Sequence, residues 1–441
     1  MKNVAELINV VVHTFAFAAA FGAVIATTCI ADATEIRRDA QGRVLGTARA
    51  DSTGRITCRD SQGRQKRPST TDSNPKWRQG DFAGKLYRQL VEGDGNLAFS
   101  PYGVASVCAL LGIGAKGETA DAFRNALELS TNKPDEVARI FREAKQDLCN
   151  AVEISDSVWL FQGFRPCDEY RTRAANGFGA EARNTSYGDA AMREINAYVS
   201  DKTHGKIPRL LQEPPEPLTR MVAVNTVYLK AKWEHGFTDE SYDREFTTLS
   251  GKSITVPFMH DYEKRAMYYK TKGLAVLALP YRDCGLEMMF LLPDKHVTLS
   301  RIEALLSRSF IGEILRALTY NKVVVALPKF EFEMRHNLVK PLCGIGLGIA
   351  FDQDRADFSG IAGTNLSLSE AEQVVKIKVD EDGTEAAAAT YAKVVRGCAS
   401  FGPKPPPPPE FVADRPFIFL IRDRRSDAIL FMGRVTNPAK K

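Results

Sequence analysis

The chain has 441 residues, of which 44% are hydrophobic and 26% charged, and its formal net charge is +5 at pH 7. These fractions are ordinary for a globular protein, and the length suits one large or two medium domains. So mild a charge gives no reason to expect a specific nucleic-acid partner. The eight cysteines contain no CxxC pair and no dense framework, which argues against a zinc ribbon and against a disulfide scaffold.

The N-terminal segment has the pattern of a secretory signal peptide. Residues 8–27 are mostly apolar, follow Lys2, and end near the A-x-A pattern Ala31-Asp-Ala33, which predicts a signal peptide over residues 1–33. An uncleaved membrane anchor is the alternative. No later stretch is apolar enough to span a bilayer, so we expect a secreted protein without membrane contact after cleavage, in the periplasm or at the cell surface if the host is bacterial. Loss of Cys29 would leave seven cysteines, an odd number, and their pairing stays open.

Residues 34–80 form a polar, basic extension with eleven Lys and Arg against five Asp and Glu. The motif D-x-x-G-R occurs in it three times, at 39–43, 51–55 and 60–64, and is good β-turn chemistry. A small hairpin module and a disordered tether both fit this segment. Its charge offers a site for a polyanion, although a solvated linker is the simpler interpretation.

Two helices are predicted at the start of the remaining chain. Residues 81–91 have helical periodicity, and residues 102–113 form an apolar helix. Ser100 is placed to cap the second helix, and Pro101 stands in its first turn.

Four further segments have clear patterns. Residues 154–161 alternate like a strand, and residues 195–207 predict a helix whose last turn ends at a glycine. Residues 224–233 are apolar almost throughout, as in a strand buried on both faces. Residues 373–379 alternate and are rich in β-branched side chains, which predicts another strand.

An acidic glycine turn and a run of small residues, 381–390, follow this last strand. Small side chains stand at alternate positions (Thr384, Ala386, Ala388 and Thr390). Because strand faces repeat every second residue, these positions would fit between two strands without a steric penalty. A short exposed helix or a loop is the alternative from composition.

Residues 381–390 resemble the hinge of the reactive-centre loop of an inhibitory serpin. Other runs of the chain also resemble serpin segments, and they occur in the same order as in the family. These runs are residues 96–101, 114–119, 224–233, 327–330, 416–421 and 430–438, so the resemblance covers residues 81–438. The hinge positions carried over are Glu381, Gly383, Thr384, Glu385, Ala386, Ala387, Ala388, Ala389 and Thr390.

The resemblance implies one α+β domain over residues 81–441, with helices packed around three β-sheets and an exposed reactive-centre loop at about 381–410. It implies a monomeric suicide-substrate inhibitor whose partner is a serine protease, held as a covalent acyl complex. The cut loop would insert into the central sheet as a new strand from Thr384 onward. The alternative is a non-inhibitory serpin-fold binding or carrier protein.

The resemblance also assigns a group of sheet-opening residues; they are Ser100, Asn225, Trp233 and Gln373. Two positions depart from the family pattern, because Gln373 stands where a histidine is usual and Gly103 where a serine is common. A glutamine side chain donates and accepts hydrogen bonds, so an altered network can persist.

The family spacing places Gly397 before the scissile bond and Cys398 after it. Glycine has no side chain to fill a specificity pocket, whereas Arg396 would bring a cation to a pocket that holds a carboxylate, the trypsin-like arrangement. We therefore predict cleavage at Arg396–Gly397, with Gly397–Cys398 second and Lys393–Val394 third.

The sequence has no G-x-S-x-G, H-E-x-x-H or P-loop motif, and its six histidines have no metal spacing. We therefore expect no enzyme activity, no cofactor and no metal. The prolines 405–409 predict a stiff polyproline II spacer, with a docking motif as the alternative. Asn184 and Asn365 stand in glycosylation sequons.

Overall fold

The computed structural model describes residues 81–439 except 162, 238, 365 and 385–406, together with four short strands between residues 34 and 66. The chain divides into two compact units, residues 1–75 and 76–441. The predicted signal peptide lies outside the described residues. No helix in the part of the chain described is long and apolar enough to cross a membrane.

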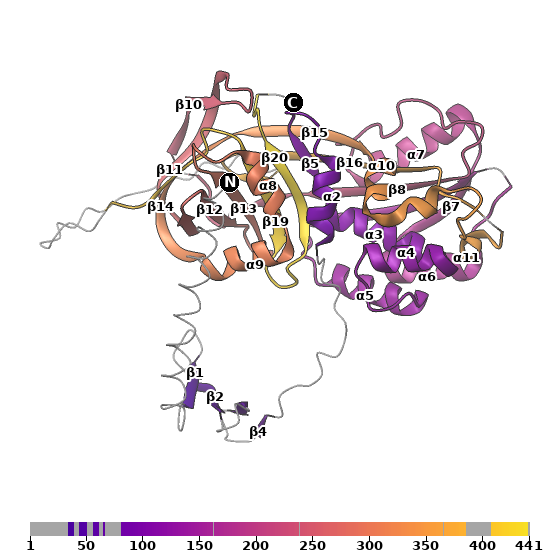
Figure 1. Cartoon of the computed structure of the whole chain (residues 1–441), viewed down its shortest axis with the longest axis horizontal. Coiled ribbons are helices and arrows are strands. Elements are labelled where there is room, and N and C mark those ends of the chain that lie inside the picture. Colours follow the sequence, from indigo (N-terminus) through magenta and orange to yellow (C-terminus); the bar gives the residue numbers. More distant parts are fainter. Residues whose placement is uncertain are drawn as a thin grey trace, which may run out of the picture. The chain divides into compact units, whose positions relative to one another are not determined.

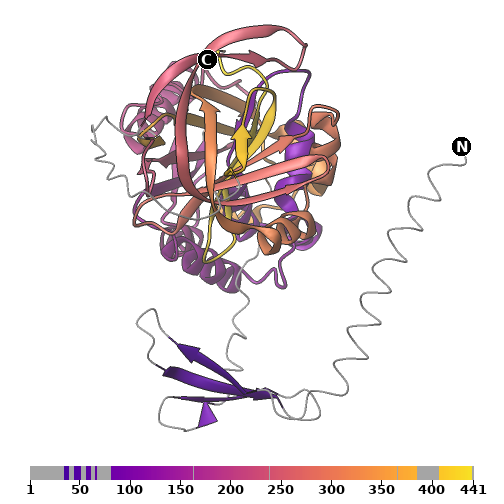
Figure 2. The same ribbon diagram turned by 90° about the vertical axis from the view of Figure 1, so that its left-hand side faces the viewer.

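The first unit contains one antiparallel sheet with its strands in sequence order (Figure 2). The strands are β1 (Thr34–Arg38), β2 (Val44–Ala50), β3 (Ile56–Asp60) and β4 (Gln65–Lys66). The three D-x-x-G-R motifs stand at the connections between them. Consecutive strands pair antiparallel across these connections.

The second unit combines helices with two extensive sheets, so the predicted α+β fold is confirmed (Figure 1). Its helices are α2 (Phe82–Leu90), α3 (Pro101–Gly112), α4 (Gly117–Ala126), α5 (Pro134–Gln146), α6 (Asp168–Phe178), α7 (Gly188–Lys202), α8 (Leu299–Leu305), α9 (Arg308–Ala317), α10 (Val339–Leu342), the π-turn η1 (Cys343–Leu347), the 3-10 turn η2 (Gly348–Phe351) and α11 (Ser359–Ala362).

The nine-stranded sheet has the order β18-β14-β11-β12-β13-β19-β20-β5, with β10 also paired to β11. Its strands are β5 (Leu97–Phe99), β10 (Asp239–Thr247), β11 (Ser253–Thr271), β12 (Leu274–Pro280), β13 (Leu286–Pro293), β14 (Thr319–Pro328), β18 (Glu410–Val412), β19 (Phe417–Asp423) and β20 (Ile429–Val435). The long β11 pairs with β10 over its first half and with β12 over its last residues. The described part of the second unit therefore has two hydrogen-bonded sheets, and β11 joins β10, β12 and β14 in the larger one.

The seven-stranded sheet, called the central sheet below, has the order β7-β6-β8-β16-β17-β9, with β15 also paired to β16. Its strands are β6 (Val152–Phe161), β7 (Glu181–Thr185), β8 (Met221–Leu229), β9 (Ala231–Lys232), β15 (Phe330–Asn337), β16 (Glu370–Val379) and β17 (Gly383–Thr384). The parallel strands β8 and β16 pair directly from Val222 and Glu370 to Val227 and Val375. Beyond that stretch, β17 lies between β16 and β9.

Both faces of the central sheet are covered by helices. One face packs against α7, where Val222, Val224 and Val374 share a core with the helix. The other face packs against α3, whose residues 101–111 are all buried. Strands covered on both faces are apolar at most positions, which explains why β8 is apolar except at Asn225 and Thr226.

The start of α3 follows the sequence prediction. Ser100 is the N-cap residue, its hydroxyl oxygen accepts a hydrogen bond from the Gly103 N–H at 3.0 Å, and Pro101 is the first helical residue. The cap fixes where the helix begins, and it places Ser100 beneath the central sheet.

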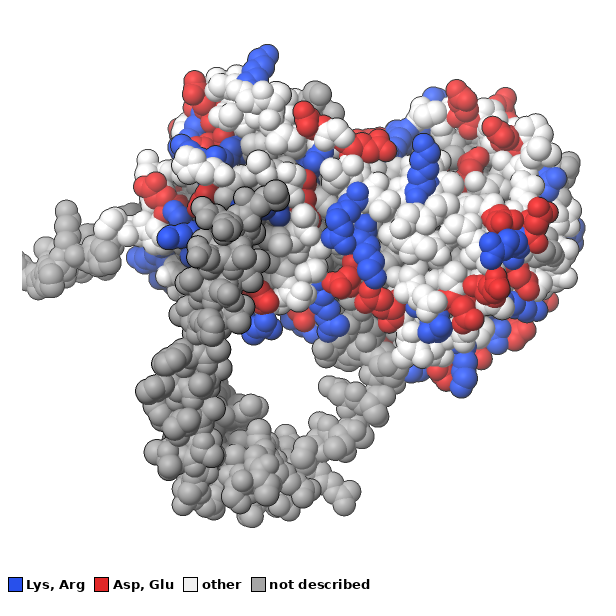
Figure 3. Space-filling view, in the orientation of Figure 1, with Lys and Arg blue, Asp and Glu red and all other residues white. Residues whose placement is uncertain are grey.

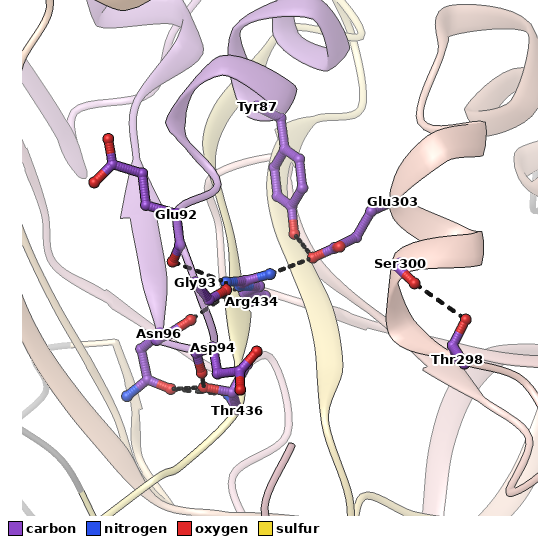
Figure 4. Close-up of polar contacts among 11 residues, drawn as sticks. Tyr87, Glu92, Gly93, Asp94, Asn96, Thr298, Ser300, Glu303, Arg434 and Thr436 are labelled. Carbon is purple, nitrogen blue, oxygen red and sulfur yellow. Dashed lines mark hydrogen bonds and ion pairs between the residues drawn. The ribbon is translucent and has the colours of Figure 1, made fainter. Parts of the chain in front are cut away.

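A buried ion pair ties helices α2 and α8 to strand β20 (Figure 4). The Arg434 guanidinium is 3% exposed and donates to a Glu303 oxygen at 3.0 Å and to the Gly93 carbonyl oxygen at 2.6 Å. The Tyr87 hydroxyl donates to the same Glu303 oxygen at 2.9 Å. Burial, and then the nearby Glu303 carboxylate, raise the pKa of Tyr87 well above its usual value.

We expect Glu303→Ala to destabilise the fold by about 3–5 kcal/mol, because it leaves the Arg434 charge buried without a counter-charge. Urea unfolding monitored by circular dichroism measures the loss. The control is Ser300→Ala on the same helix, since Ser300 is exposed and bonds only its neighbour Thr298 in Figure 4. Equal stability of the two variants would contradict the role given to this ion pair.

Candidate functional site

The chain turns back on itself directly after β16. The Asp380 N–H donates to the Gly383 carbonyl oxygen at 3.0 Å, and Gly383 lies against β9. A Cβ atom at Gly383 would meet the Ala231 carbonyl oxygen at 2.1 Å, and the φ angle there is +151°. Glycine is therefore required at this turn, both for its backbone conformation and for the close approach.

Thr384, the second residue of β17, occupies a position inside the central sheet. It is 1% exposed and lies opposite Val379 of β16 on one side and Ala231 of β9 on the other. Its hydroxyl is 2.6 Å from the Tyr281 hydroxyl. Thr384 is the one described position among the alternate small residues that the sequence predicts to fit between two strands.

Trp233 holds the turn in place. Its indole N–H donates to the Asp380 carbonyl oxygen and its backbone N–H to the Asp382 carbonyl oxygen, each at 2.9 Å. The ring stacks on Tyr281 with 4.6 Å between centroids. The stacked Trp233 and Tyr281 rings thus support the turn at residues 380–383 that leads into β17.

Glu381 is anchored by charge. Its carboxylate pairs with the Lys329 ammonium and accepts a hydrogen bond from Ser241. Partial burial opposes ionisation of Glu381, but the bonds from Lys329 and Ser241 outweigh it and lower its pKa. The carboxylate therefore stays ionised at neutral pH and fixes the base of the hinge.

The rest of the predicted hinge and every predicted scissile bond lie outside the described residues; they are Glu385, Ala386, Ala387, Ala388, Ala389, Thr390, Lys393, Arg396, Gly397 and Cys398. The chain is described again from residue 407, where the Pro409 carbonyl oxygen accepts from the Val324 N–H and β18 joins β14. The segment between β17 and β18 thus connects the central sheet to the nine-stranded sheet.

Gln373 bridges the two strands that the loop would have to separate. It stands opposite Asn225 in the register of β16 and β8, and its amide N–H donates to the Asn225 side-chain oxygen at 2.8 Å. The same amide exchanges hydrogen bonds with the backbone of Ser100, accepting at 2.9 Å and donating at 3.1 Å. A fully buried amide with all these partners holds β16, β8 and the start of α3 together.

Gly103 takes part in this network through its lack of a side chain. A Cβ atom there would stand 2.2 Å from the Asn225 side-chain oxygen. The glycine therefore lets β8 approach α3 closely enough for Asn225 to reach Gln373. Ser100 contributes its backbone to Gln373, while its hydroxyl caps the helix.

Asp156, which was not among the residues predicted from the sequence, completes the network. Its two carboxylate oxygens accept from the Asn225 amide at 2.7 Å and from the Ser106 hydroxyl at 2.6 Å. Burial raises the pKa of this fully buried carboxyl, although the bonds from Ser106 and Asn225 and the charge of Lys145 act in the opposite direction. The sequence did contain a sign of this role, because Asp156 is an acidic residue on the same face of the predicted strand as the apolar Ile154 and Val158.

We expect Asp156→Asn to stabilise the protein above acidic pH. Because the folded-state pKa of Asp156 is raised above the unfolded value near 3.8, the folded state binds this proton more tightly. Stability from this carboxyl is thus fully present below that pH and is lost as pH rises through the folded pKa. An asparagine keeps both hydrogen bonds, with Ser106 now accepting, and cannot ionise.

Melting temperatures of the variant and the parent between about pH 4 and about pH 8 test this prediction. The advantage of Asp156→Asn should be small at the acid end and grow with pH. Asp354→Asn, at an exposed aspartate, should track the parent throughout. A difference that is constant with pH, or largest in acid, would contradict the assignment.

The described residues bear on the expected absence of a metal site and on the two glycosylation sequons. No group of three or more His, Cys, Asp or Glu side chains among these residues could hold a metal ion. Asn184 is exposed on β7, so its side chain is accessible, whereas Asn365 lies outside the described residues.

Comparisons with known proteins agree with this geometry. The family model described as "Serpin (serine protease inhibitor)" matches residues 78–438. The leukocyte elastase inhibitor of Bos taurus is 33% identical, over 81% of this chain and 97% of its own length. Tengpin, a thermophilic serpin in its native state, superposes with a TM-score of 0.76 over 84% of this chain and 96% of its own, at 24% identity. Thyroxine-binding globulin in complex with thyroxine superposes with a TM-score of 0.72 over 82% and 98%, at 26% identity.

The family model spans most of the chain and contains both the hinge turn and the buried network beneath the central sheet. The chain belongs to the serpin family.

Proposed function

We propose that this protein is a suicide-substrate inhibitor of a trypsin-like serine protease. The observation that supports it best is the position of Thr384, buried in β17 between β16 and β9. Insertion of the loop would only have to extend a strand that has already begun. The sequence that follows, Glu385 to Thr390, has no proline and no bulky side chain.

In the proposed reaction the protease serine attacks the Arg396 carbonyl carbon, the amine of Gly397 leaves, and an ester joins Arg396 to the protease. The freed segment then extends β17 between β8 and β16. This breaks the six residue pairs from Glu370 to Val375, together with the Gln373–Asn225 hydrogen bond. Two new ladders replace the one lost, so the inserted form lies lower in free energy.

The bound protease would be displaced with the end of the loop before water hydrolyses the ester. The native fold is then a kinetically trapped state, and the energy released on insertion drives the displacement. The protein's own residues perform no catalysis in this scheme, since the nucleophile and the base belong to the protease. That agrees with a family whose model is described as serine protease inhibitor.

A binding or carrier protein is the second candidate, and the similarity to thyroxine-binding globulin favours it. The two candidates differ in what happens after a cut in the loop. An inhibitor inserts the cut loop and traps the protease, whereas carriage of a ligand needs neither step. The small residues of the hinge favour the inhibitor candidate, because they would allow the cut loop to insert between strands.

We further propose secretion, supported by the apolar residues 8–27, and an ancillary polyanion contact through the basic extension. On the face drawn in Figure 3, basic and acidic side chains of the described residues are intermixed. The polyanion proposal is based on the basic composition of residues 34–80. We propose a monomer as the working form.

The scissile bond is tested by reacting the protein with a trypsin-like and a chymotrypsin-like protease and identifying the released peptide by mass spectrometry. We expect a new N-terminus at Gly397 with the trypsin-like enzyme. Arg396→Ala should abolish the reaction at this bond, and Lys393→Ala should leave it unchanged. A new N-terminus at Cys398 or Val394 would contradict the assignment.

A further inference from the structure

Two cysteines far apart in the sequence stand in neighbouring loops of the second unit. Cys149 lies between α5 and β6, and Cys284 lies in the hairpin between β12 and β13. Both belong to or pack against the same hydrophobic core. Neither takes part in the hinge turn or in the network around Gln373.

Strand β9 brings the two loops together. At its beginning, the Lys230 N–H donates to the Ala151 carbonyl oxygen at 3.0 Å. At its end, the Arg282 N–H donates to the Lys232 carbonyl oxygen at 2.8 Å. Ala151 is two positions from Cys149, and Arg282 is two positions from Cys284. The two loops are therefore hydrogen-bonded to the backbone on either side of the same two-residue strand.

Arg425 touches both loops from the hairpin between β19 and β20. Its guanidinium donates to the Asp147 carbonyl oxygen, two residues before Cys149. Its Nε lies 3.3 Å from the point where a Cβ atom of Gly285 would stand, next to Cys284. One side chain therefore spans the space between the two cysteine-bearing loops.

The thiols differ in access. Cys284 is buried and 7% exposed, whereas Cys149 is half-buried. Burial raises the pKa of Cys284 to about 11, and a hydrogen bond with the Cys149 thiol contributes to the rise. The two thiols stand on the adjoining loops that Arg425 bridges, and Cys149, the less buried of them, is the one that a reagent in solution can reach.

We propose that Cys149 and Cys284 form an intramolecular disulfide when the protein meets a low-molecular-weight disulfide. The Cys149 thiolate attacks one sulfur of the reagent and releases the first small thiol. Cys284 then gives up its proton and attacks the Cys149 sulfur, releasing the second small thiol. The two protein thiols lose two electrons and two protons, and the reagent is reduced to two thiols.

The bond would close a loop of 135 residues next to the hinge. Tyr281, three residues before Cys284, stacks on Trp233 and contacts the hydroxyl of Thr384. The disulfide therefore fixes the hairpin that supports the first inserted residue. Closing so long a loop should raise the melting temperature by roughly 5 °C.

The test treats the full chain with oxidised glutathione or with a reductant, blocks free thiols by alkylation and identifies the peptides by mass spectrometry. We expect a crosslinked peptide pair containing Cys149 and Cys284 only after oxidation, together with the higher melting temperature. Cys149→Ser should lose both effects. Cys343→Ser, at an exposed cysteine, should keep both.

Three results would overturn the proposal: alkylation of Cys149 and Cys284 after oxidation, a stable mixed disulfide of glutathione on Cys149, or a bond from either residue to another cysteine. The peptide analysis of the unmodified chain decides among these outcomes without any variant. Neither the crosslinked peptide nor the melting temperature depends on protease inhibition, so this proposal can fail or hold independently of the proposed function.

Discussion

Thr384→Arg is expected to turn the protein from an inhibitor into an ordinary substrate. Thr384 is 1% exposed, and its hydroxyl is 2.6 Å from the hydroxyl of Tyr281. An arginine there would bring an unpaired charge into the central sheet, at a cost of about 3–5 kcal/mol. The loop would still be cut, but insertion would begin too slowly to trap the protease before hydrolysis.

The measurement is the number of inhibitor molecules consumed for each protease molecule inactivated. This ratio should rise at least tenfold in Thr384→Arg, which corresponds to about 1.4 kcal/mol in the competition between trapping and hydrolysis. Thr384→Ser is the matched control, because it keeps the hydroxyl that contacts Tyr281 and should retain the parental ratio. An unchanged ratio in the arginine variant would contradict insertion of the loop as an extension of β17.

Cutting the loop between Lys393 and Gly397 is expected to raise the melting temperature sharply. A strand of about ten residues, inserted between β8 and β16, adds roughly ten backbone hydrogen bonds beyond those it replaces, each worth about 1 kcal/mol. With about 2.1 cal/mol/K of unfolding entropy per residue, a gain of about 10 kcal/mol corresponds to a rise of roughly 13 °C for a domain of about 360 residues. Calorimetry before and after a mapped cut measures it.

The variant Thr384→Arg, cut at the same bond, serves as the control for this effect. It should show little or no gain, because its loop is blocked at the first inserted side chain. An equal melting temperature before and after the cut in the parent protein would mean that the loop stays outside the sheet. The carrier alternative would then be favoured.

The elements that carry the site could be predicted because their signals are local. The cap at Ser100 depends on the next three residues, and the buried strand β8 depends on a run that is apolar except at Asn225 and Thr226. The hinge could be recognised from its glycine and the small residues after it. That Thr384 already lies within the sheet could not be predicted, because this depends on Tyr281 and on β9, both more than 100 positions away.

The network beneath the sheet was predicted only in part. Gln373 and Asn225 were identified through the family resemblance, but their geometry depends on Gly103 and on the buried carboxylate of Asp156. These four residues come from four different elements, and no spacing in the sequence relates them. Side-chain networks of this kind follow from tertiary packing rather than from local pattern.

The most direct test of the central claim, that the loop traps a protease covalently, is denaturing gel electrophoresis after reaction with an active trypsin-like protease. The account predicts a band with the summed mass of protease and inhibitor that survives SDS and boiling. A protease whose catalytic serine is replaced by alanine should give no such band, because no ester can form. If the active protease yields only cleaved inhibitor and free enzyme, the protein is a substrate and the proposed function is wrong.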